Sequence, residues 1–273
     1  TGYLMTSSDN GYTWTSHRDS IPAAVAGLFP NVTGCCVEPD SLLGAIKNQP
    51  IALAKGFRCA DGTVLERDRI LSPTSKETAE ASKVKAGQWR CYVEISEDGG
   101  KSWTLGPVVP QPEGFKTIQP TLLVHRDGRI QMLCRTAPPA KDHGELARVA
   151  TSFSNDGGLT WSKMQLIDNL PNNNSGIDAV TLADGTFALI YNPFGCVDWR
   201  DKTDKARNKP LRNPLYIATS TDGLHWTPCL RLESSPISQY SYPSMIVGSD
   251  GTLHCIYTWR RQRIKYQRVS NRP

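Results

Sequence analysis

The sequence lacks long apolar runs, a strong charge of one sign and closely paired cysteines, and each absence excludes a class of protein. No segment of its 273 residues approaches the roughly 18 consecutive apolar residues that a membrane-spanning helix needs. The 31 basic and 26 acidic residues are interspersed, and a net charge of +5 is too small for a nucleic-acid-binding surface. The eight cysteines contain no CxxC pair, which argues against a zinc cluster. A globular protein that binds a small anionic molecule remains possible.

One short motif occurs four times along the chain. It combines a serine, an aspartate, a glycine and a tryptophan, and its copies span Ser7–Trp14, Ser96–Trp103, Ser154–Trp161 and, one residue shorter, Ser220–Trp226. In each copy the aspartate can accept hydrogen bonds from backbone amides, and the glycine can adopt a positive φ. The tryptophan can anchor the turn beneath the following strand. Each copy therefore predicts a β-hairpin.

A second turn signal, Asp-Gly, alternates with this motif. It occurs at Asp61, Asp127, Asp184 and Asp250, between segments with the alternating pattern of β-strands. Two hairpins per repeat give four antiparallel strands in units of about 45 to 65 residues, which is typical of a β-propeller blade. The units span residues 45–103, 117–161 and 176–226, followed by a three-stranded unit at 242–269. Residues 1–20 hold only the last hairpin of a further blade.

We therefore expect an all-β fold, a β-propeller of four-stranded antiparallel blades in a single domain spanning residues 1–273. About five blades are present, which suggests a six-bladed parent whose N-terminal blade is missing from this chain. The sequence starts at Thr1 and its first residues lack signal-peptide regions, which agrees with this expectation. The alternative is two stacked β-sandwich domains, but the repeated tryptophan-ended turns favour the propeller.

The strand order predicts which residues gather at one end of the blades. In an antiparallel blade the start of strand one, the end of strand two and the start of strand three lie together, opposite the predicted turns. The residues at these positions are Lys47, Asn48, Gln119, Arg135, Asn174, Asp178, Asn192, Arg212, Tyr242 and Arg260. A cationic cluster with carboxamides and a phenol suits an anionic sugar, because a guanidinium group binds a carboxylate through two hydrogen bonds.

Some of these assignments have plainer alternatives. Tyr240 competes with Tyr242 for the place in the pocket, and Asp178 could instead cap the turn that follows NNNSG. Lys47 and Asn48 could be polar residues of the rim.

Two segments near the predicted site also allow more than one interpretation. In TWRRQRIKY, strand alternation sends Arg260 and Gln262 to one face and the tryptophan and the other arginines to the opposite face. Arg260 is then the best site candidate, and the rest of the run is a solvated face. The insertion at 193–211 is either a lid over the pocket or a variable surface loop.

The repeated turns and the phrases around them resemble the sialidase (neuraminidase) superfamily, in its branch of BNR-repeat or Asp-box proteins. The phrases are LLGAIKNQPI, IQPTLLVHRDGRIQMLCRT, NNNSGIDAVTLADGTFALIYN and YSYPSMIVGSDGTLHCIYTWRRQRIKY. The resemblance implies a six-bladed propeller, three arginines that hold the substrate carboxylate, a tyrosine nucleophile activated by a glutamate, and an aspartate acid/base. Arg135 resembles the second arginine, Arg212 the third, and Tyr242 the nucleophile. No phrase of this chain matches the first arginine or the acid/base aspartate of the N-terminal blades.

Gln119 departs from the family pattern. It stands where the resemblance implies the activating glutamate, and a carboxamide cannot accept a proton as a carboxylate does. Related propellers act as rhamnosidases or uronate lyases, in which arginines bind a glucuronate carboxylate. A lyase needs charge neutralisation and a single base, and Tyr242 flanked by Arg135 and Arg212 would meet that need.

The resemblance thus implies an exo-acting, sialidase-like glycoside hydrolase for glycans bearing an acidic sugar. The alternatives are a uronate-directed polysaccharide lyase or rhamnosidase, and an inactive glycan-binding propeller. We assign catalytic roles to Tyr242, Asp178 and Gln119, and substrate binding to Arg135, Arg212, Arg260, Asn192, Lys47, Asn48 and Asn174. No cofactor or metal is implied. The oligomeric state and the compartment stay open, although a secreted, periplasmic or lysosome-like location would suit the parent.

Overall fold

The computed structural model describes residues 4–6, 13, 15–17, 48–76, 89–100, 102–137, 148–193, 212–235 and 239–270. Within these ranges the regular elements are β-strands that pair in antiparallel sheets. This described part of the chain has no helix that is long and apolar enough to cross a membrane.

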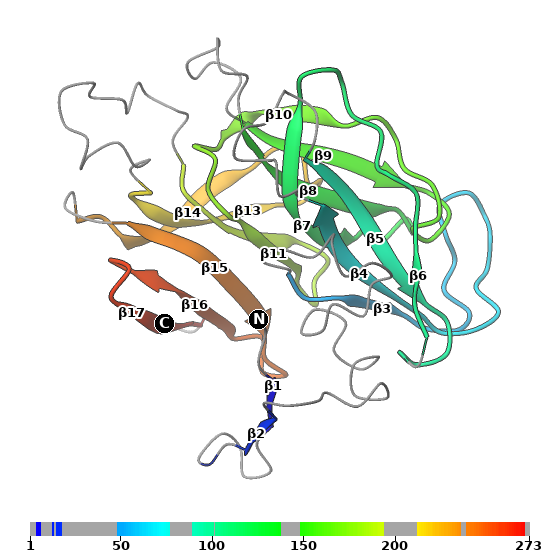
Figure 1. The fold of residues 1–273 in the computed structure, drawn as a ribbon, viewed down its shortest axis with the longest axis horizontal. Helices are drawn as coiled ribbons and strands as arrows, with labels where there is room; N and C mark the ends of the chain where they lie inside the picture. Colours follow the sequence, from blue (N-terminus) through cyan, green and yellow to red (C-terminus); the bar gives the residue numbers. More distant parts are fainter. Residues whose placement is uncertain are drawn as a thin grey trace.

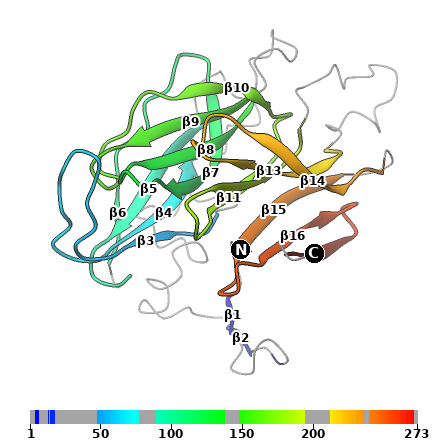
Figure 2. The same ribbon diagram turned by 180° about the vertical axis from the view of Figure 1, so that it is seen from behind.

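Three four-stranded sheets follow one another along the chain, each built from consecutive strands (Figures 1 and 2). The first sheet contains β3 (Ile51–Leu53), β4 (Arg69–Lys76), β5 (Arg90–Ser96) and β6 (Thr104–Leu105). The second contains β7 (Lys116–Val124), β8 (Ile130–Ala137), β9 (Arg148–Ser154) and β10 (Gln165–Pro171). The third contains β11 (Asp178–Thr181), β12 (Phe187–Tyr191), β13 (Leu215–Ser220) and β14 (Thr227–Glu233).

Two smaller sheets complete the described structure. The fourth sheet has three strands, as predicted, and they are β15 (Tyr240–Val247), β16 (Leu253–Trp259) and β17 (Arg263–Val269). Near the N-terminus, β1 (Leu4–Thr6) pairs with β2 (Thr15–His17).

The first four sheets pack face to face in order, the first on the second, the second on the third and the third on the fourth. Strand alternation divides the apolar side chains between neighbouring interfaces. Met132 and Cys134 of β8 belong to the core between the first and second sheets, whereas Leu133 belongs to the core between the second and third. A third core joins the third and fourth sheets, where Ile190 and Met245 are fully buried. The all-β propeller is therefore confirmed. A pair of sandwiches would bury only one face of each sheet.

The inner strands β3, β7, β11 and β15 follow one another around the centre of the molecule (Figure 1). Gln49, two residues before β3, donates from Nε2 to the Met245 carbonyl of β15 at 3.0 Å, across 196 positions of sequence. The start of the first sheet thus lies against the innermost strand of the fourth.

The tryptophan-ended motifs form the predicted hairpins β5–β6, β9–β10 and β13–β14. In the second of these, Asp156 Oδ1 accepts the amide N–H groups of Leu159 and Thr160 at 3.0 and 2.9 Å. The Trp161 indole donates to the Gly158 carbonyl at 3.1 Å, which closes the turn beneath the strand. The copy at Ser7–Trp14 lies outside the described residues apart from Thr13, although β1 and β2 flank it.

Candidate functional site

Backbone conformation singles out the end of the blades where the sequence places the site. The described chain has five non-glycine residues with left-handed φ angles, namely Gln119 (54°), Asn174 (60°), Tyr242 (52°), Arg260 (54°) and Arg261 (51°). Four of them are predicted site residues. Such conformations cost about 1 to 3 kcal/mol each and persist at functional sites, where the surrounding structure holds them in place.

Arg135 lies at the end of β8 and is only 7% exposed. Its Nε donates to Asn174 Oδ1 at 2.7 Å, and its Nη1 donates to Gln119 Oε1 at 2.8 Å. Both acceptors are uncharged amides, so they orient the guanidinium group without neutralising it.

Arg212, three residues before β13, approaches the same place from the third sheet and is 6% exposed. Its Nη2 donates to the Asn174 carbonyl at 3.4 Å. Its Nε and Nη1 are buried, and within the described chain neither has a hydrogen-bond partner. Buried donors of a charged group are costly to leave unpaired, so these two N–H groups are suited to an anionic ligand.

Tyr242 of β15 lies beside both arginines. The guanidinium carbon of Arg212 is 4.8 Å from the centre of the tyrosine ring. Burial alone would raise the pKa of the phenol, but hydrogen bonding and charge from Arg212, followed by Arg135, lower that pKa below its ordinary value. The phenol is therefore easier to deprotonate than that of an ordinary tyrosine.

A glycine gives Tyr242 and Gln119 the space to approach each other. A Cβ atom on Gly176 would lie 3.3 Å from Gln119 Oε1 and 3.4 Å from Tyr242 Cδ1. Gln119 is itself 5% exposed, and its backbone N–H donates to Ser75 Oγ at 3.2 Å. Its side chain can hold Arg135 but cannot take up a proton.

Asp178 lies at the same end but is enclosed between sheets. Its Oδ1 accepts hydrogen bonds from the Thr121 hydroxyl and the Ala179 backbone N–H, each at 2.9 Å. Its Oδ2 accepts one from the Met245 N–H at 2.8 Å. The side chain is fully buried, and burial raises the pKa of its carboxyl to about 7 against the opposing effect of these donors. These contacts link the second, third and fourth sheets.

Two predicted asparagines also connect neighbouring elements. Asn48 Nδ2 donates to the carbonyls of Pro120 and Ile177 at 3.0 and 3.1 Å. Asn192 Nδ2 donates to those of Pro214 and Tyr240 at 2.7 and 3.1 Å. Both side chains thus hold backbone segments in place around the site.

The remaining predictions fall at the edge of the cluster or outside the described residues. Arg260 forms the turn between β16 and β17, and the expected strand alternation through this run is wrong because the chain reverses there. The Gln262 N–H donates to the Trp259 carbonyl at 3.0 Å, which closes that turn. Lys47 and the insertion beyond Pro193 lie outside the described residues.

Trp89 is a site residue that the sequence reasoning missed. It directly precedes β5, and its ring centre is 6.0 Å from the guanidinium carbon of Arg135. The indole Nε1 is buried and has no partner within the described chain, and Gln111 Nε2 donates to the Trp89 carbonyl at 3.2 Å. Trp89 lies at the start of the third strand of its sheet, one of the strand ends that the antiparallel order brings to the site, and this position could have identified it from the sequence.

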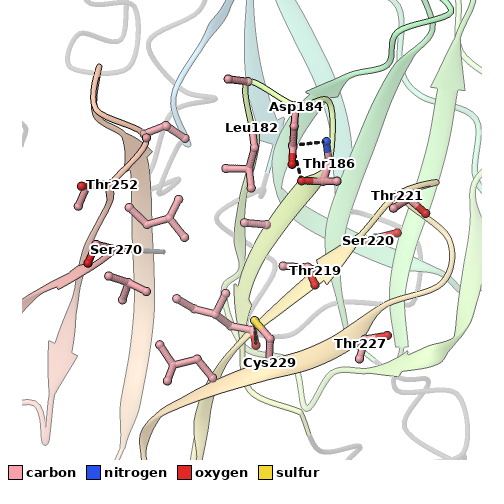
Figure 3. A pocket seen from close by; sticks show the side chains of 18 of the residues that line it. Leu182, Asp184, Thr186, Thr219, Ser220, Thr221, Thr227, Cys229, Thr252 and Ser270 are labelled. Atoms are coloured by element: carbon pink, nitrogen blue, oxygen red, sulfur yellow. Dashed lines mark hydrogen bonds between the residues drawn. The ribbon is translucent and has the colours of Figure 1, made fainter. Parts of the chain in front are cut away.

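A separate groove of about 870 Å³ lies between the third and fourth sheets, beside the Asp184 and Asp250 turns (Figure 3). Its lining combines apolar side chains with the hydroxyls of Thr219, Thr221 and Thr227. It contains none of the predicted site residues and no arginine or lysine. This groove therefore lacks the arginines that would bind an acidic group. In the described residues, no group of three or more His, Cys, Asp or Glu side chains could hold a metal ion.

The BNR repeat-like domain model matches residues 1–255, so the chain belongs to the BNR repeat-like family. The predicted likeness to sialidase-like BNR proteins is thereby confirmed at the level of family and fold. A comparison with functionally curated proteins gave no match.

Solved structures with the same fold include a sialidase, a trans-sialidase and an arabinanase. NanB sialidase from Streptococcus pneumoniae is 15% identical with a TM-score of 0.54, over 98% of this chain and 35% of that one. An intramolecular trans-sialidase from Ruminococcus gnavus is 16% identical, with a TM-score of 0.53, over 98% and 50%. An α-L-arabinanase from Penicillium chrysogenum is 14% identical, with a TM-score of 0.54, over 97% and 69%. The chain thus spans about a third of the length of the NanB enzyme.

Proposed function

We propose that this protein acts on glycans that carry an acidic sugar. The observation that supports this most directly is the pair of buried arginines, Arg135 and Arg212, which both interact with the strained Tyr242. The fold shared with sialidases and an arabinanase agrees with a carbohydrate substrate.

In this proposal the arginines bind the carboxylate of the sugar. The Nε and Nη1 groups of Arg212, which have no partner within the described chain, leave two charged nitrogens available to donate hydrogen bonds to an acidic group. Arg135, held by Asn174 and Gln119, contributes the second positive charge. Because both side chains are largely removed from water, their attraction for an anion is stronger than at an exposed surface.

Tyr242 is the reactive group of a retaining hydrolase in this scheme. Its phenolate oxygen attacks the anomeric carbon, the bond from that carbon to the leaving-group oxygen breaks, and that oxygen takes a proton from solvent. Water then displaces the tyrosine, which releases the sugar, a proton and the phenolate. The arginines lower the pKa of the phenol, and this substitutes for the carboxylate base that Gln119 cannot be.

The absence of a carboxylate at Gln119 also favours a second candidate, a uronate lyase. Here the Tyr242 phenolate removes the proton from the carbon next to the uronate carboxylate. The bond between the neighbouring carbon and the glycosidic oxygen breaks, a carbon–carbon double bond forms, and the leaving oxygen takes up a proton. The arginines would stabilise the charge that develops on the carboxylate during this step.

The deciding experiment incubates the full chain with a sialoside and, separately, with a rhamnosyl-glucuronate glycan. Free sugar indicates hydrolysis, whereas ultraviolet absorbance of an unsaturated uronate indicates elimination. Tyr242→Phe is expected to lower either activity by at least about a hundredfold, because the phenolate is lost. Arg135→Ala is expected to weaken substrate binding.

Arg268→Ala is the matched control, because Arg268 pairs with Asp250 at 3.1 Å at the opposite end of the blades and should leave activity unchanged. Calorimetric binding of an acidic sugar without turnover would identify an inactive glycan-binding propeller instead. Absence of both binding and turnover would contradict the proposal.

A further inference from the structure

The hairpin turn between β16 and β17 has a backbone that its sequence does not favour. Arg260 and Arg261 both adopt left-handed φ angles, and the Gln262 N–H closes the turn on the Trp259 carbonyl. This is a type I′ turn, whose central positions strongly prefer Asn-Gly because both need a positive φ. Two arginines at these positions cost backbone free energy. This cost points to a functional role for their side chains, which Asn-Gly could not fill.

Positive charge is crowded at this turn. The guanidinium carbons of Arg260 and Arg263 lie 4.3 and 4.2 Å from the centre of the Trp259 ring. Arg260 Nη2 donates to Ser235 Oγ at 3.2 Å, and Arg261 Nε donates to Gln239 Oε1. These contacts with an aromatic ring, a hydroxyl and an amide position the guanidinium groups but leave their charge in place.

No carboxylate of the described chain forms an ion pair with Arg260, Arg261 or Arg263. At the opposite end of the blades, in contrast, arginines have acidic partners. Arg129 pairs with Asp127 at 2.7 Å, and Arg268 pairs with Asp250 at 3.1 Å. These two arginines are therefore paired with carboxylates, whereas the three arginines at the end that holds Tyr242 have no such partner in the described chain.

The turn adjoins the proposed carboxylate site. The Arg260 N–H donates to the Gln239 carbonyl at 2.8 Å, and the next residue, Tyr240, donates its N–H to the Arg212 carbonyl at 2.7 Å. Tyr240 also pairs with Trp259 across β15 and β16. Backbone hydrogen bonds therefore link the turn to Arg212 through Gln239 and Tyr240.

We propose that the Arg260–Arg261 turn, with Arg263, is a second anion subsite that binds another acidic group of the same glycan. The substrate is then a polyanionic oligosaccharide with carboxylate or sulfate groups on more than one sugar, and not a glycan with a single terminal acid. This inference rests on the proposed function, because the first acidic group occupies the Arg135–Arg212 site. Arginine suits the role because its planar guanidinium group binds either oxyanion through paired hydrogen bonds.

The test uses the double variant Arg260→Asn/Arg261→Gly, which gives the turn the residues that its backbone prefers. We expect the melting temperature to rise, because the strain is relieved. We also expect affinity for a galacturonate tetramer, measured by calorimetry, to fall at least about tenfold, while affinity for galacturonate monomer stays unchanged. A sulfated oligosaccharide tested in parallel distinguishes a sulfate preference from a carboxylate preference.

Arg268→Ala is the control for a general loss of positive charge. Unchanged tetramer affinity in the double variant would overturn the second subsite, as would an equal loss of monomer and tetramer affinity. A wild-type protein that binds tetramer no better than monomer would do the same. If wild-type protein binds neither these sugars nor the sialoside or rhamnosyl-glucuronate glycan, the proposed function itself fails. If it binds only the sialoside or the rhamnosyl-glucuronate glycan, the second subsite alone fails, so the two failures are distinguishable.

Discussion

The guanidinium carbon of Arg212 lies 4.8 Å from the centre of the Tyr242 ring, and two of its buried nitrogens have no partner in the described chain. In the proposed function, this contact joins the group that binds the substrate and the group that reacts with it. A carboxylate bound to the arginine would lie next to the phenol, so recognition and chemistry would depend on the same pair.

The first prediction concerns the ionisation of Tyr242. Arg212→Met should raise the pKa of this phenol towards its ordinary value or above it, because the strongest opposing influence on the burial effect is removed. Ultraviolet titration of phenolate absorbance, with Tyr242→Phe subtracted to isolate one tyrosine, measures the shift. An unchanged titration would show that Arg212 does not control the phenol.

The second prediction concerns Gly176. A Cβ atom there would lie within 3.4 Å of both Gln119 and Tyr242, so Gly176→Ala should displace one of them. We expect a fall in activity on an acidic glycan of about tenfold, with a melting temperature close to that of the wild type. Equal losses of activity and stability would indicate a general packing defect instead.

The third prediction concerns Trp89. Trp89→Phe keeps an aromatic ring beside Arg135 but removes the buried indole N–H that has no partner in the described residues. Affinity for the acidic glycan should fall by roughly tenfold or less, as expected for one hydrogen bond. Ligand-induced quenching of tryptophan fluorescence should also shrink. Full quenching in the variant would place Trp89 away from the ligand.

The fourth prediction concerns the pH dependence of stability. Glu94 is 1% exposed, and burial raises the pKa of its carboxyl from 4.5 to about 7. A carboxyl whose pKa is raised on folding stabilises the protein most below the unfolded pKa, and this contribution is lost as pH rises through the folded pKa. The free energy of unfolding should therefore fall between about pH 4.5 and pH 7.

Glu94→Gln should flatten that dependence by the order of 1 to 3 kcal/mol, because the amide cannot ionise. Urea unfolding at several pH values measures it. A dependence as steep as that of the wild type would assign the effect to other groups, with the buried Asp178 carboxyl, whose pKa is also about 7, as the next candidate.

The parts of the fold that were predictable depend on local sequence. The turn at Asp156–Trp161 is closed by residues within five positions of one another, so its sequence alone specifies it. The grouping of Gln119, Arg135 and Tyr242 also follows from strand order, because antiparallel strands fix which ends lie together.

The parts that were not predictable depend on contacts between distant residues. Asp178 shares the end of the blades with Tyr242, but its carboxylate is used by the Met245 amide 67 positions away. Asn174 holds Arg135 with its side chain and Arg212 with its carbonyl, which no spacing rule indicates. The Arg260–Arg261 turn was missed because arginines rarely adopt the backbone that it requires.

The hydrogen bond between Gln49 and Met245 also constrains the order in which the molecule assembles. During synthesis the first, second and third sheets can pack in turn as each leaves the ribosome, because their interfaces join neighbours in sequence. The contact at the centre cannot form until Met245 has emerged, 196 residues after Gln49. Closure of such a large loop is entropically costly and typically slow. The nascent chain therefore passes through open arcs before the strands around Tyr242 can reach their final positions.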